Sequence, residues 1–237
     1  MIESIYGKFI VNRYCYYQAE ALIKTGATHI ESELNNIKKI INALPEGAVA
    51  IDAGANIGFV SIPMANILTK KNGMVFAFEP QRMLYYALCG TATLNDLSNL
   101  KIINSALGSK SGELKIPPQN YGEASDFGRL SLVKQKNIES SDVVDVVRID
   151  DMNLHRLDFL KIDVEGMEID VLAGAMESIK KYRPYCWIEY WMIDKDMLID
   201  QFKGLNYNIY KMDKLNVLCA PEEKLKEHNF NISAPNL

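Results

Sequence analysis

The sequence has little of what would mark a disulfide scaffold, a zinc protein, a membrane protein or a nucleic-acid binder. Its 237 residues include four cysteines and three histidines, with no C-x-x-C pair or other zinc-ligand spacing. No apolar run approaches the roughly 18 residues that span a bilayer, and the first residues lack the basic-then-apolar pattern of a signal peptide. The net charge of −4 argues against a dedicated nucleic-acid binder. We therefore expect a cytoplasmic protein with reduced thiols, no membrane span and no nucleic-acid partner.

Hydrophobic residues make up 48% of the chain and charged residues 24%, which suffices for a sizeable core. Short apolar runs alternate with segments of helical periodicity. We expect strands at 48–52, 74–79, 100–105, 143–150, 159–164, 185–190, 207–212 and 216–221, with a short extra strand at 113–117. We expect helices at 31–44, 57–69, 81–95, 168–182 and 194–204. Pro63 must lie near the start of its helix or kink it.

Strands separated by helix-length segments pair in parallel, and apolar runs without alternation are covered on both faces. The prediction is one domain over residues 1–237, of the α/β class. It consists of a helical extension at 1–45 and a Rossmann-like core at 46–220. The core is a doubly wound, mostly parallel seven-stranded sheet that ends in an antiparallel C-terminal hairpin.

Polar residues stand where the predicted strands end, and ligands of such sheets bind beyond the carboxyl ends of the strands. These residues are Asp52 with its glycine loop, Glu79 and Pro80, Asn104 and Ser105, Asp163 to Gly166, and Glu189. We expect them to face one crevice. Lys161 lies inside a strand, so it should pair with one of these acids, because an unpaired buried ammonium is costly.

The loop after the first core strand reads D-x-G-x-x-x-G, from Asp52 through Gly54 to Gly58. It differs from the G-x-G-x-x-G of dinucleotide enzymes. An acid before the first glycine suits a ligand with an amino-acid portion, and Glu79 is placed to accept hydrogen bonds from a ribose. A nucleoside with an amino-acid tail and no diphosphate describes S-adenosylmethionine.

Five motifs resemble the FkbM family of S-adenosylmethionine-dependent methyltransferases, whose fold is that of class I methyltransferases. They read AIDAGANIGFVS (50–61), VFAFEP (75–80), INSALGSKSGEL (103–114), VRIDDM (147–152) and FLKIDVEGMEIDVLAGA (159–175). The resemblance implies a cofactor site that holds the methionine part, the ribose and the adenine. Its residues would be Asp52, Gly54, Ala55, Asn56, Gly58, Glu79, Pro80, Asn104 and Ala106. The segment YGEASDFGRLSL (121–132) would lie over the acceptor pocket.

The resemblance also implies an acceptor hydroxyl on a sugar, a glycan or a glycosylated metabolite, with Asp163 and Glu165 near the transferred methyl group. We expect Asp163 or Glu189 to act as the general base, with Glu165 orienting the acceptor or Asp163. Glu165 could instead pair with Lys161 and be structural. A divalent cation between Asp163 and Glu189 is compatible with their oxygen ligands, but we favour catalysis without a metal.

Other readings stay open at this stage. Asp52 could cap the following helix, and Asn104 could be a turn residue. Asn95 is better explained as a helix C-cap, and Glu33 as a solvated helix residue rather than a ligand of the cofactor's amino group. The acceptor could be a lipid, peptide or polyketide, or the protein could bind the cofactor without catalysis. The sequence does not fix the oligomeric state.

Overall fold

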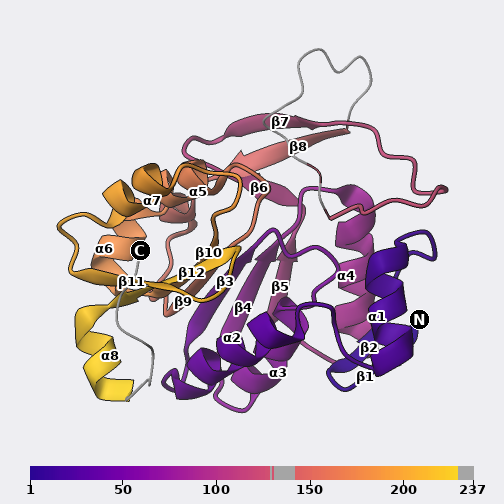
Figure 1. Ribbon diagram of the computed structural model, residues 1–237, viewed down its shortest axis with the longest axis horizontal. Coiled ribbons are helices and arrows are strands. Elements are labelled where there is room, and N and C mark those ends of the chain that lie inside the picture. Colours follow the sequence, from indigo (N-terminus) through magenta and orange to yellow (C-terminus); the bar gives the residue numbers. More distant parts are fainter. Residues whose placement is uncertain (129, 131–141, 229–237) are drawn as a thin grey trace.

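A computed structural model describes residues 1–128, 130 and 142–228 (Figure 1). The strands are β1 (Ile2–Ser4), β2 (Gly7–Phe9), β3 (Val49–Ala53), β4 (Met74–Phe78), β5 (Leu100–Ile103), β6 (Ser105–Leu107), β7 (Gly112–Ile116), β8 (Asp142–Val147), β9 (Phe159–Ile162), β10 (Tyr185–Glu189), β11 (Tyr207–Lys211) and β12 (Asn216–Pro221). The helices are α1 (Tyr16–Thr25), α2 (Glu31–Ala43), α3 (Ser61–Thr69), α4 (Arg82–Leu94), α5 (Glu168–Ala173), α6 (Met176–Tyr182), α7 (Lys195–Phe202) and α8 (Glu222–His228), with a 3₁₀ turn at Ile149–Met152.

The central sheet has seven strands in the order β11-β12-β10-β9-β3-β4-β5. Neighbours from β10 to β5 pair in parallel, and β12 runs antiparallel to both β10 and β11. The C-terminal hairpin therefore adds one reversed strand, β12, which lies between β10 and the edge strand β11. This order confirms the predicted fold class, a mostly parallel seven-stranded α/β sheet.

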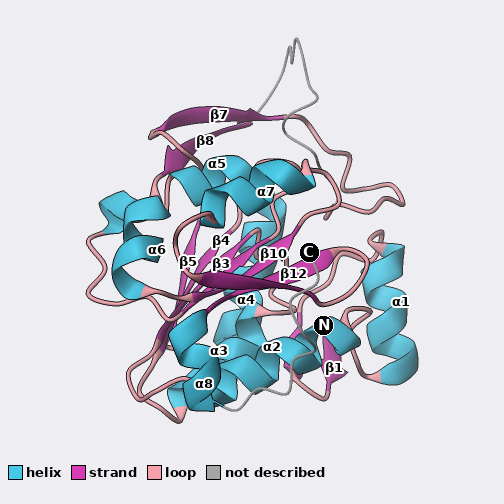
Figure 2. Cartoon of the chain, turned by 60° about the vertical axis from the view of Figure 1, so that its left-hand side comes forward, coloured by secondary structure: helices cyan, strands magenta, loops and turns pink. Residues whose placement is uncertain are grey.

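Helices cover both faces of the sheet, and each face has its own apolar core (Figure 2). Helices α2, α3 and α4 pack on one face, against side chains such as Phe159 and Trp187. Helices α5, α6 and α7 pack on the other face, against side chains such as Leu160 and Cys186. Successive strand residues point to opposite faces, so Phe159, Lys161 and Asp163 share the face of α2.

Local sequence explains several element boundaries. Pro63 is the third residue of α3, where its missing N–H has no partner to lose. Asp194 caps α7, because its Oδ1 accepts from the backbone N–H groups of Asp196 and Met197 at 2.8 and 3.2 Å. Asn95 follows the last residue of α4, in the C-cap position that the sequence favours.

Several predicted elements differ from the structure. The helix expected at 57–69 begins at Ser61, and the strand expected at 159–164 ends at Ile162. The helix expected at 168–182 is two helices that break at Gly174, where a Cβ would lie 2.0 Å from the Gly108 carbonyl oxygen. The strand expected at 100–105 ends at Ile103, and Ser105 begins β6, which belongs to a separate sheet of order β6-β8-β7. The strand expected at 143–150 ends at Val147. The short strand expected at 113–117 is present as β7.

The N-terminal segment contains the expected helix α2 and also a hairpin, β1–β2, that was not predicted. Figure 1 shows this hairpin beside α4, and α1 contacts β1. The contact is polar: Asn95 Oδ1 accepts from Lys8 N at 2.9 Å, and Thr91 Oγ1 accepts from Ile10 N at 3.0 Å. Within the described part of the chain, no helix has the length and apolarity to cross a membrane.

Candidate active site

A cavity of about 310 Å³ opens at the carboxyl ends of the central strands. The predicted site has nine cofactor-binding residues and three acids. Ten of these twelve residues line the cavity, and two do not. Those that line it are Asp52, Gly54, Ala55, Asn56, Glu79, Pro80, Ala106, Asp163, Glu165 and Glu189. The two others are Gly58 and Asn104. Their positions in one cavity follow from the parallel sheet, whose strand ends meet at one edge.

The loop after β3 depends on the glycine at position 54. Gly54 has a φ of +79°, which favours glycine, and a Cβ there would lie 1.8 Å from the Asp163 carbonyl oxygen. The N–H groups of Gly54 and Ala55 both donate to the Phe78 carbonyl oxygen, at 3.0 and 2.9 Å. The loop is therefore pressed between the ends of β4 and β9.

The carboxylate of Glu79 is held by the backbone on both sides. Oε2 accepts from Asn56 N and Oε1 accepts from Gln81 N, each at 2.8 Å. Burial raises the pKa of Glu79 to about 7, although these two hydrogen bonds act in the opposite direction. Each oxygen keeps a lone pair, so Glu79 can still accept hydrogen bonds from a ligand.

Gly58 and Asn104 support the cavity from outside its lining. A Cβ at Gly58 would lie 2.5 Å from a side-chain carbon of Leu88, so the glycine permits close packing against α4. Asn104 Nδ2 donates to the carbonyl oxygens of Glu79 and Pro80, at 2.9 and 3.1 Å. In this arrangement Asn104 fixes the turn after β4.

Lys161 lies between two carboxylates in the middle of the sheet. Its side chain is 4% exposed, and its Nζ is 3.1 Å from Asp163 Oδ2 and 3.4 Å from Asp52 Oδ1. Burial by itself would lower the pKa of Lys161, but the neighbouring carboxylates outweigh it and raise the pKa. The expected pairing of Lys161 with an acid is confirmed, and it links the β3 loop to the end of β9.

Asp52 does not cap α3, because α3 begins at Ser61 with Val60 in the N-cap position. Its Oδ2 accepts from the Ser61 hydroxyl at 2.5 Å. Burial raises the pKa of Asp52, against the effect of the nearby Lys161 ammonium. Asp52 is fully buried and forms part of the floor of the cavity.

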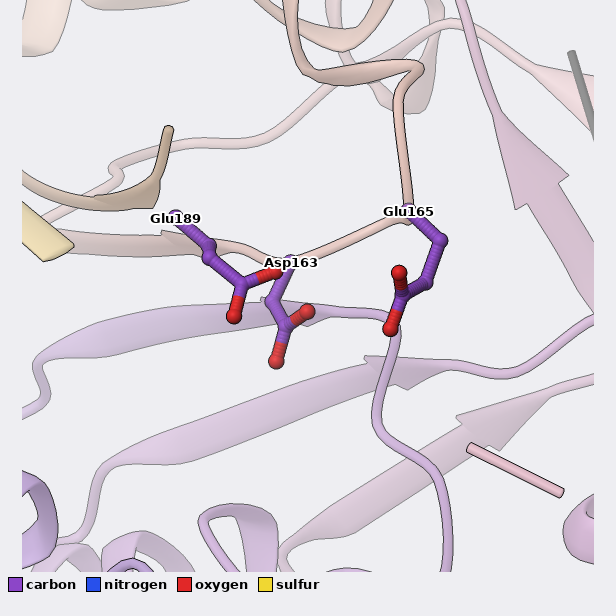
Figure 3. A group of neighbouring side chains, drawn as sticks. All are labelled: Asp163, Glu165 and Glu189. Atoms are coloured by element: carbon purple, nitrogen blue, oxygen red, sulfur yellow. The ribbon is translucent and has the colours of Figure 1, made fainter. Parts of the chain in front are cut away.

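Three acids lie close together where β9 and β10 end (Figure 3). A carboxylate oxygen of each of Asp163, Glu165 and Glu189 lies within 4.8 Å of the others. Burial and then the charges of Asp163 and Glu165 raise the pKa of Glu189 to about 9. Glu189 is therefore mainly protonated at neutral pH. The same three oxygens also have a spacing that a divalent cation can use.

The turn that carries two of these acids is shaped by Glu168. Glu165 and Gly166 have φ values of +55° and +108°, and the Glu168 carboxylate accepts from the N–H groups of Val164 and Gly166 at 3.2 and 3.1 Å. Glu168 is buried. Its role is thus to hold this turn, and it also lies in the first turn of α5, where the helix dipole favours an acidic residue.

Several cavity residues come from parts of the chain where no sequence motif indicated a site. Gln18 on α1 is 3% exposed, and its Oε1 has no hydrogen-bond partner within the part of the chain that the structure describes. Glu33 on α2 accepts from Trp187 Nε1 at 3.1 Å, and burial raises its pKa to about 7. Glu33 lines the cavity, whereas the sequence analysis favoured a solvated helix residue at this position.

Part of the segment expected over the acceptor pocket is described. Asp126, Gly128 and Leu130 line the cavity, and Gln81 Nε2 donates to the Phe127 carbonyl oxygen at 2.8 Å. Arg129 and residues 131–132 of that segment lie outside the described residues.

Comparison with known proteins agrees with this geometry. The model of a family described as "Methyltransferase FkbM domain" matches residues 52–209, a range that includes the β3 loop, Glu79 and all three clustered acids. This chain belongs to the FkbM methyltransferase family. It is an S-adenosylmethionine-dependent methyltransferase with the class I fold.

Individual FkbM relatives are distant. Methyltransferase sdnD of Sordaria araneosa is 28% identical over 224 residues, which cover 81% of this chain and 80% of the relative. 2-O-methyltransferase NoeI of Sinorhizobium fredii is 25% identical over 175 residues, 67% of this chain and 70% of the relative. The crystal structure of Methyltransferase FkbM from Methylobacillus flagellatus has a TM-score of 0.54 at 18% identity. It aligns over 89% of this chain but only 56% of its own length.

The residues that line the cavity fit S-adenosylmethionine. Glu79 has two fixed carboxylate oxygens, which would accept hydrogen bonds from ribose hydroxyls, and the buried Gln18 Oε1 is an acceptor without a partner among the described residues. The acidic floor also suits a cationic ligand.

Proposed function

We propose that this FkbM protein methylates a hydroxyl group of a sugar, a glycan or a glycosylated metabolite. The observation that carries the proposal is the cluster of Asp163, Glu165 and Glu189 at one end of the cavity. Carboxyl groups at this density can bind and deprotonate a polyhydroxylated acceptor. A relative named as a 2-O-methyltransferase supports oxygen as the methyl acceptor.

S-adenosylmethionine, when bound, supplies an activated methyl group, so the protein's main tasks are alignment and proton removal. In this proposal the loop from Gly54 to Asn56 holds the methionine part of the cofactor, and Glu79 accepts hydrogen bonds from the ribose. Pro80 and Ala106 lie along the adenine. Gln18 Oε1 accepts a hydrogen bond from the cofactor's ammonium group, which would satisfy a buried acceptor that has no other partner.

The three acids would divide their tasks according to their surroundings. Lys161 Nζ lies 3.1 Å from Asp163 Oδ2 and fixes the position of this carboxylate at the end of the cavity, so we assign Asp163 as the general base. Glu189, whose pKa is raised to about 9, is mainly a hydrogen-bond donor at neutral pH and orients the acceptor. Glu165 accepts a hydrogen bond from a second acceptor hydroxyl.

Calorimetry and a methyl-transfer assay test the proposal together. S-adenosylmethionine and S-adenosylhomocysteine should bind, NAD should not, and Glu79→Ala should abolish binding. With a panel of methyl glycosides as acceptors, Asp163→Asn should lower kcat by roughly 10²- to 10⁴-fold, the usual contribution of a general base. It should leave S-adenosylhomocysteine affinity unchanged.

The matched control is Glu113→Gln, which neutralises an exposed acid on β7 and should change neither quantity. If Asp163→Asn keeps full activity, the assignment of the base is wrong. If the folded protein binds neither cofactor form, the proposed function is wrong. Treatment with EDTA tests the metal: retained activity supports metal-free catalysis, whereas loss that Mg²⁺ restores assigns the acid cluster to a cation.

A further inference from the structure

An exposed tryptophan stands at the acceptor end of the cavity. Trp191 follows β10 by two residues and is 51% exposed, whereas Trp187, within β10, is fully buried. Single exposed apolar side chains are common on protein surfaces and by themselves mean nothing. Trp191 differs because its indole is hydrogen-bonded to a residue of the site.

The tie is a hydrogen bond to one of the clustered acids. Trp191 Nε1 donates to Glu189 Oε2 at 2.9 Å, and Glu189 lines the cavity. The indole N–H edge is therefore anchored beside the carboxyl cluster, while about half of the side chain stays open to solvent. An anchored ring loses little further freedom when a ligand packs on it.

The same rim continues across the neighbouring strand. Leu215 is 43% exposed and lines the cavity, and its carbonyl oxygen accepts from Tyr190 N at 2.8 Å. The turn after β10 and the start of β12 are thus joined beside Glu189. Beside the cavity, the indole of Trp191 meets Glu189 and the side chain of Leu215 lines the wall, so an aromatic group and an aliphatic group lie near the carboxyl cluster.

A pyranose ring has the complementary surface. Its hydroxyls form a polar edge that hydrogen-bonds to carboxyl groups, and its ring C–H groups form an apolar face that packs against an indole. A flexible alkyl chain would use the aromatic group but leave the carboxyl groups unsatisfied. A phosphorylated or carboxylated acceptor would meet like charges.

We propose that Trp191 is a stacking platform for the pyranose ring of the acceptor, held in place by Glu189. This inference rests on the proposed function and deepens it. It assigns the acceptor as an uncharged glycoside whose ring packs on Trp191 while its hydroxyls face Asp163, Glu165 and Glu189. Trp191 is a binding residue here and takes no part in proton transfer.

Tryptophan fluorescence gives the first test. The chain has two tryptophans, and one is buried, so acrylamide quenching reports mainly on Trp191. The probes are methyl pyranosides of the common hexoses and 6-deoxyhexoses, added one at a time to protein saturated with S-adenosylhomocysteine. At least one should lower the quenching constant by more than half, and glycerol at equal mass concentration should not. If no glycoside protects Trp191, the platform does not exist.

Variants then separate stacking from the tie to Glu189. Saturation-transfer NMR with the protecting glycoside should show that Trp191→Ala weakens binding about tenfold, the factor equivalent to about 1.4 kcal/mol. Trp191→Phe keeps an aromatic face and should weaken binding less than threefold. The control Tyr86→Ala removes an exposed aromatic residue on α4 and should have no effect.

Each remaining outcome decides the matter. Equal damage from Trp191→Phe and Trp191→Ala would show that the Nε1–Glu189 bond matters and the ring face does not, which overturns the platform. Binding that Trp191→Ala leaves unchanged overturns it as well. S-adenosylhomocysteine titrations on the same samples keep the two proposals apart, since failure of cofactor binding in the wild-type protein counts against the proposed function.

Discussion

The two ends of the cavity are built in different ways. At the cofactor end, polar groups are fixed by nearby backbone: two peptide N–H groups hold Glu79, and the loop at Gly54 is pressed against the end of β9. At the acceptor end, the arrangement depends on charged side chains: Lys161 of β9 pairs with Asp163, and the charges of Asp163 and Glu165 raise the pKa of Glu189 on β10. A site that is fixed by the backbone tolerates little change in shape. A site that depends on charged side chains is sensitive to the loss of an ion-pair partner and to pH.

The largest effect should come from the cofactor end. Gly54→Ala adds a Cβ at a φ of +79°, 1.8 Å from the Asp163 carbonyl oxygen, so the loop or β9 must move. We expect a loss of at least about 3 kcal/mol in unfolding free energy, measured by urea denaturation, and no cofactor binding. Gly204→Ala is the matched control, because Gly204 has a φ of +74° but no atom within 4 Å of its Cβ position. A similar loss in both variants would show that the close approach contributes nothing.

The acceptor end should respond most to loss of its cation. Lys161→Met leaves Asp52 and Asp163 without their shared partner, and removing one member of a buried ion pair costs about 3 kcal/mol or more. Urea denaturation should show this loss, and adding Asp52→Asn should recover part of it. Lys203→Met is the control, since that side chain is 80% exposed. No recovery in the double variant would contradict the charge-based explanation.

The pH dependence of stability tests the buried carboxyl group at the cofactor end. The pKa of Glu79 rises from 4.5 to about 7 on folding, so the folded state holds a proton that the unfolded state has released. Its contribution is fully present below pH 4.5 and is lost as pH rises to about 7, a loss on the order of 3 kcal/mol. In the cofactor-free protein, Glu79→Gln should reduce the fall in stability over this interval, to which Glu33 and Glu189 also contribute because their pKa values are raised to about 7 and about 9. Glu113→Gln should leave the fall unchanged. If the slope of unfolding free energy against pH is unchanged in Glu79→Gln, the group that titrates in this interval is not Glu79.

The smallest effect on stability should come from a substitution at Gln18, and this substitution should stabilise the protein. Gln18→Leu removes a buried acceptor without a partner, so the thermal stability of the cofactor-free protein should rise, by up to about 1 kcal/mol. Affinity for S-adenosylhomocysteine should fall about tenfold, the factor for one lost hydrogen bond of about 1.4 kcal/mol. Affinity for methylthioadenosine, which lacks the amino-acid part, should not change. If the affinity for both ligands falls equally, Gln18 does not contact the ammonium group.

The sequence by itself determined the class of the fold, the order of the main strands and most of the cavity. Apolar runs such as 48–51 and 74–78 predict buried parallel strands, and parallel strands bring their polar ends to one edge. Asp52, Glu79 and Asp163 could therefore be placed together without coordinates.

Only the tertiary structure decided the rest. Gln18 and Glu33 enter the cavity because α1 and α2 pack over the sheet, and nothing in their local sequence specifies that contact. The break at Gly174 depends on the approach of Gly108, 66 residues away in the chain. The raised pKa of Glu189 and the exposure of Trp191 likewise depend on neighbours from other strands. Periodicity and strand-end residues are local properties, whereas burial, pairing and charge are set by segments that meet only when the chain has folded.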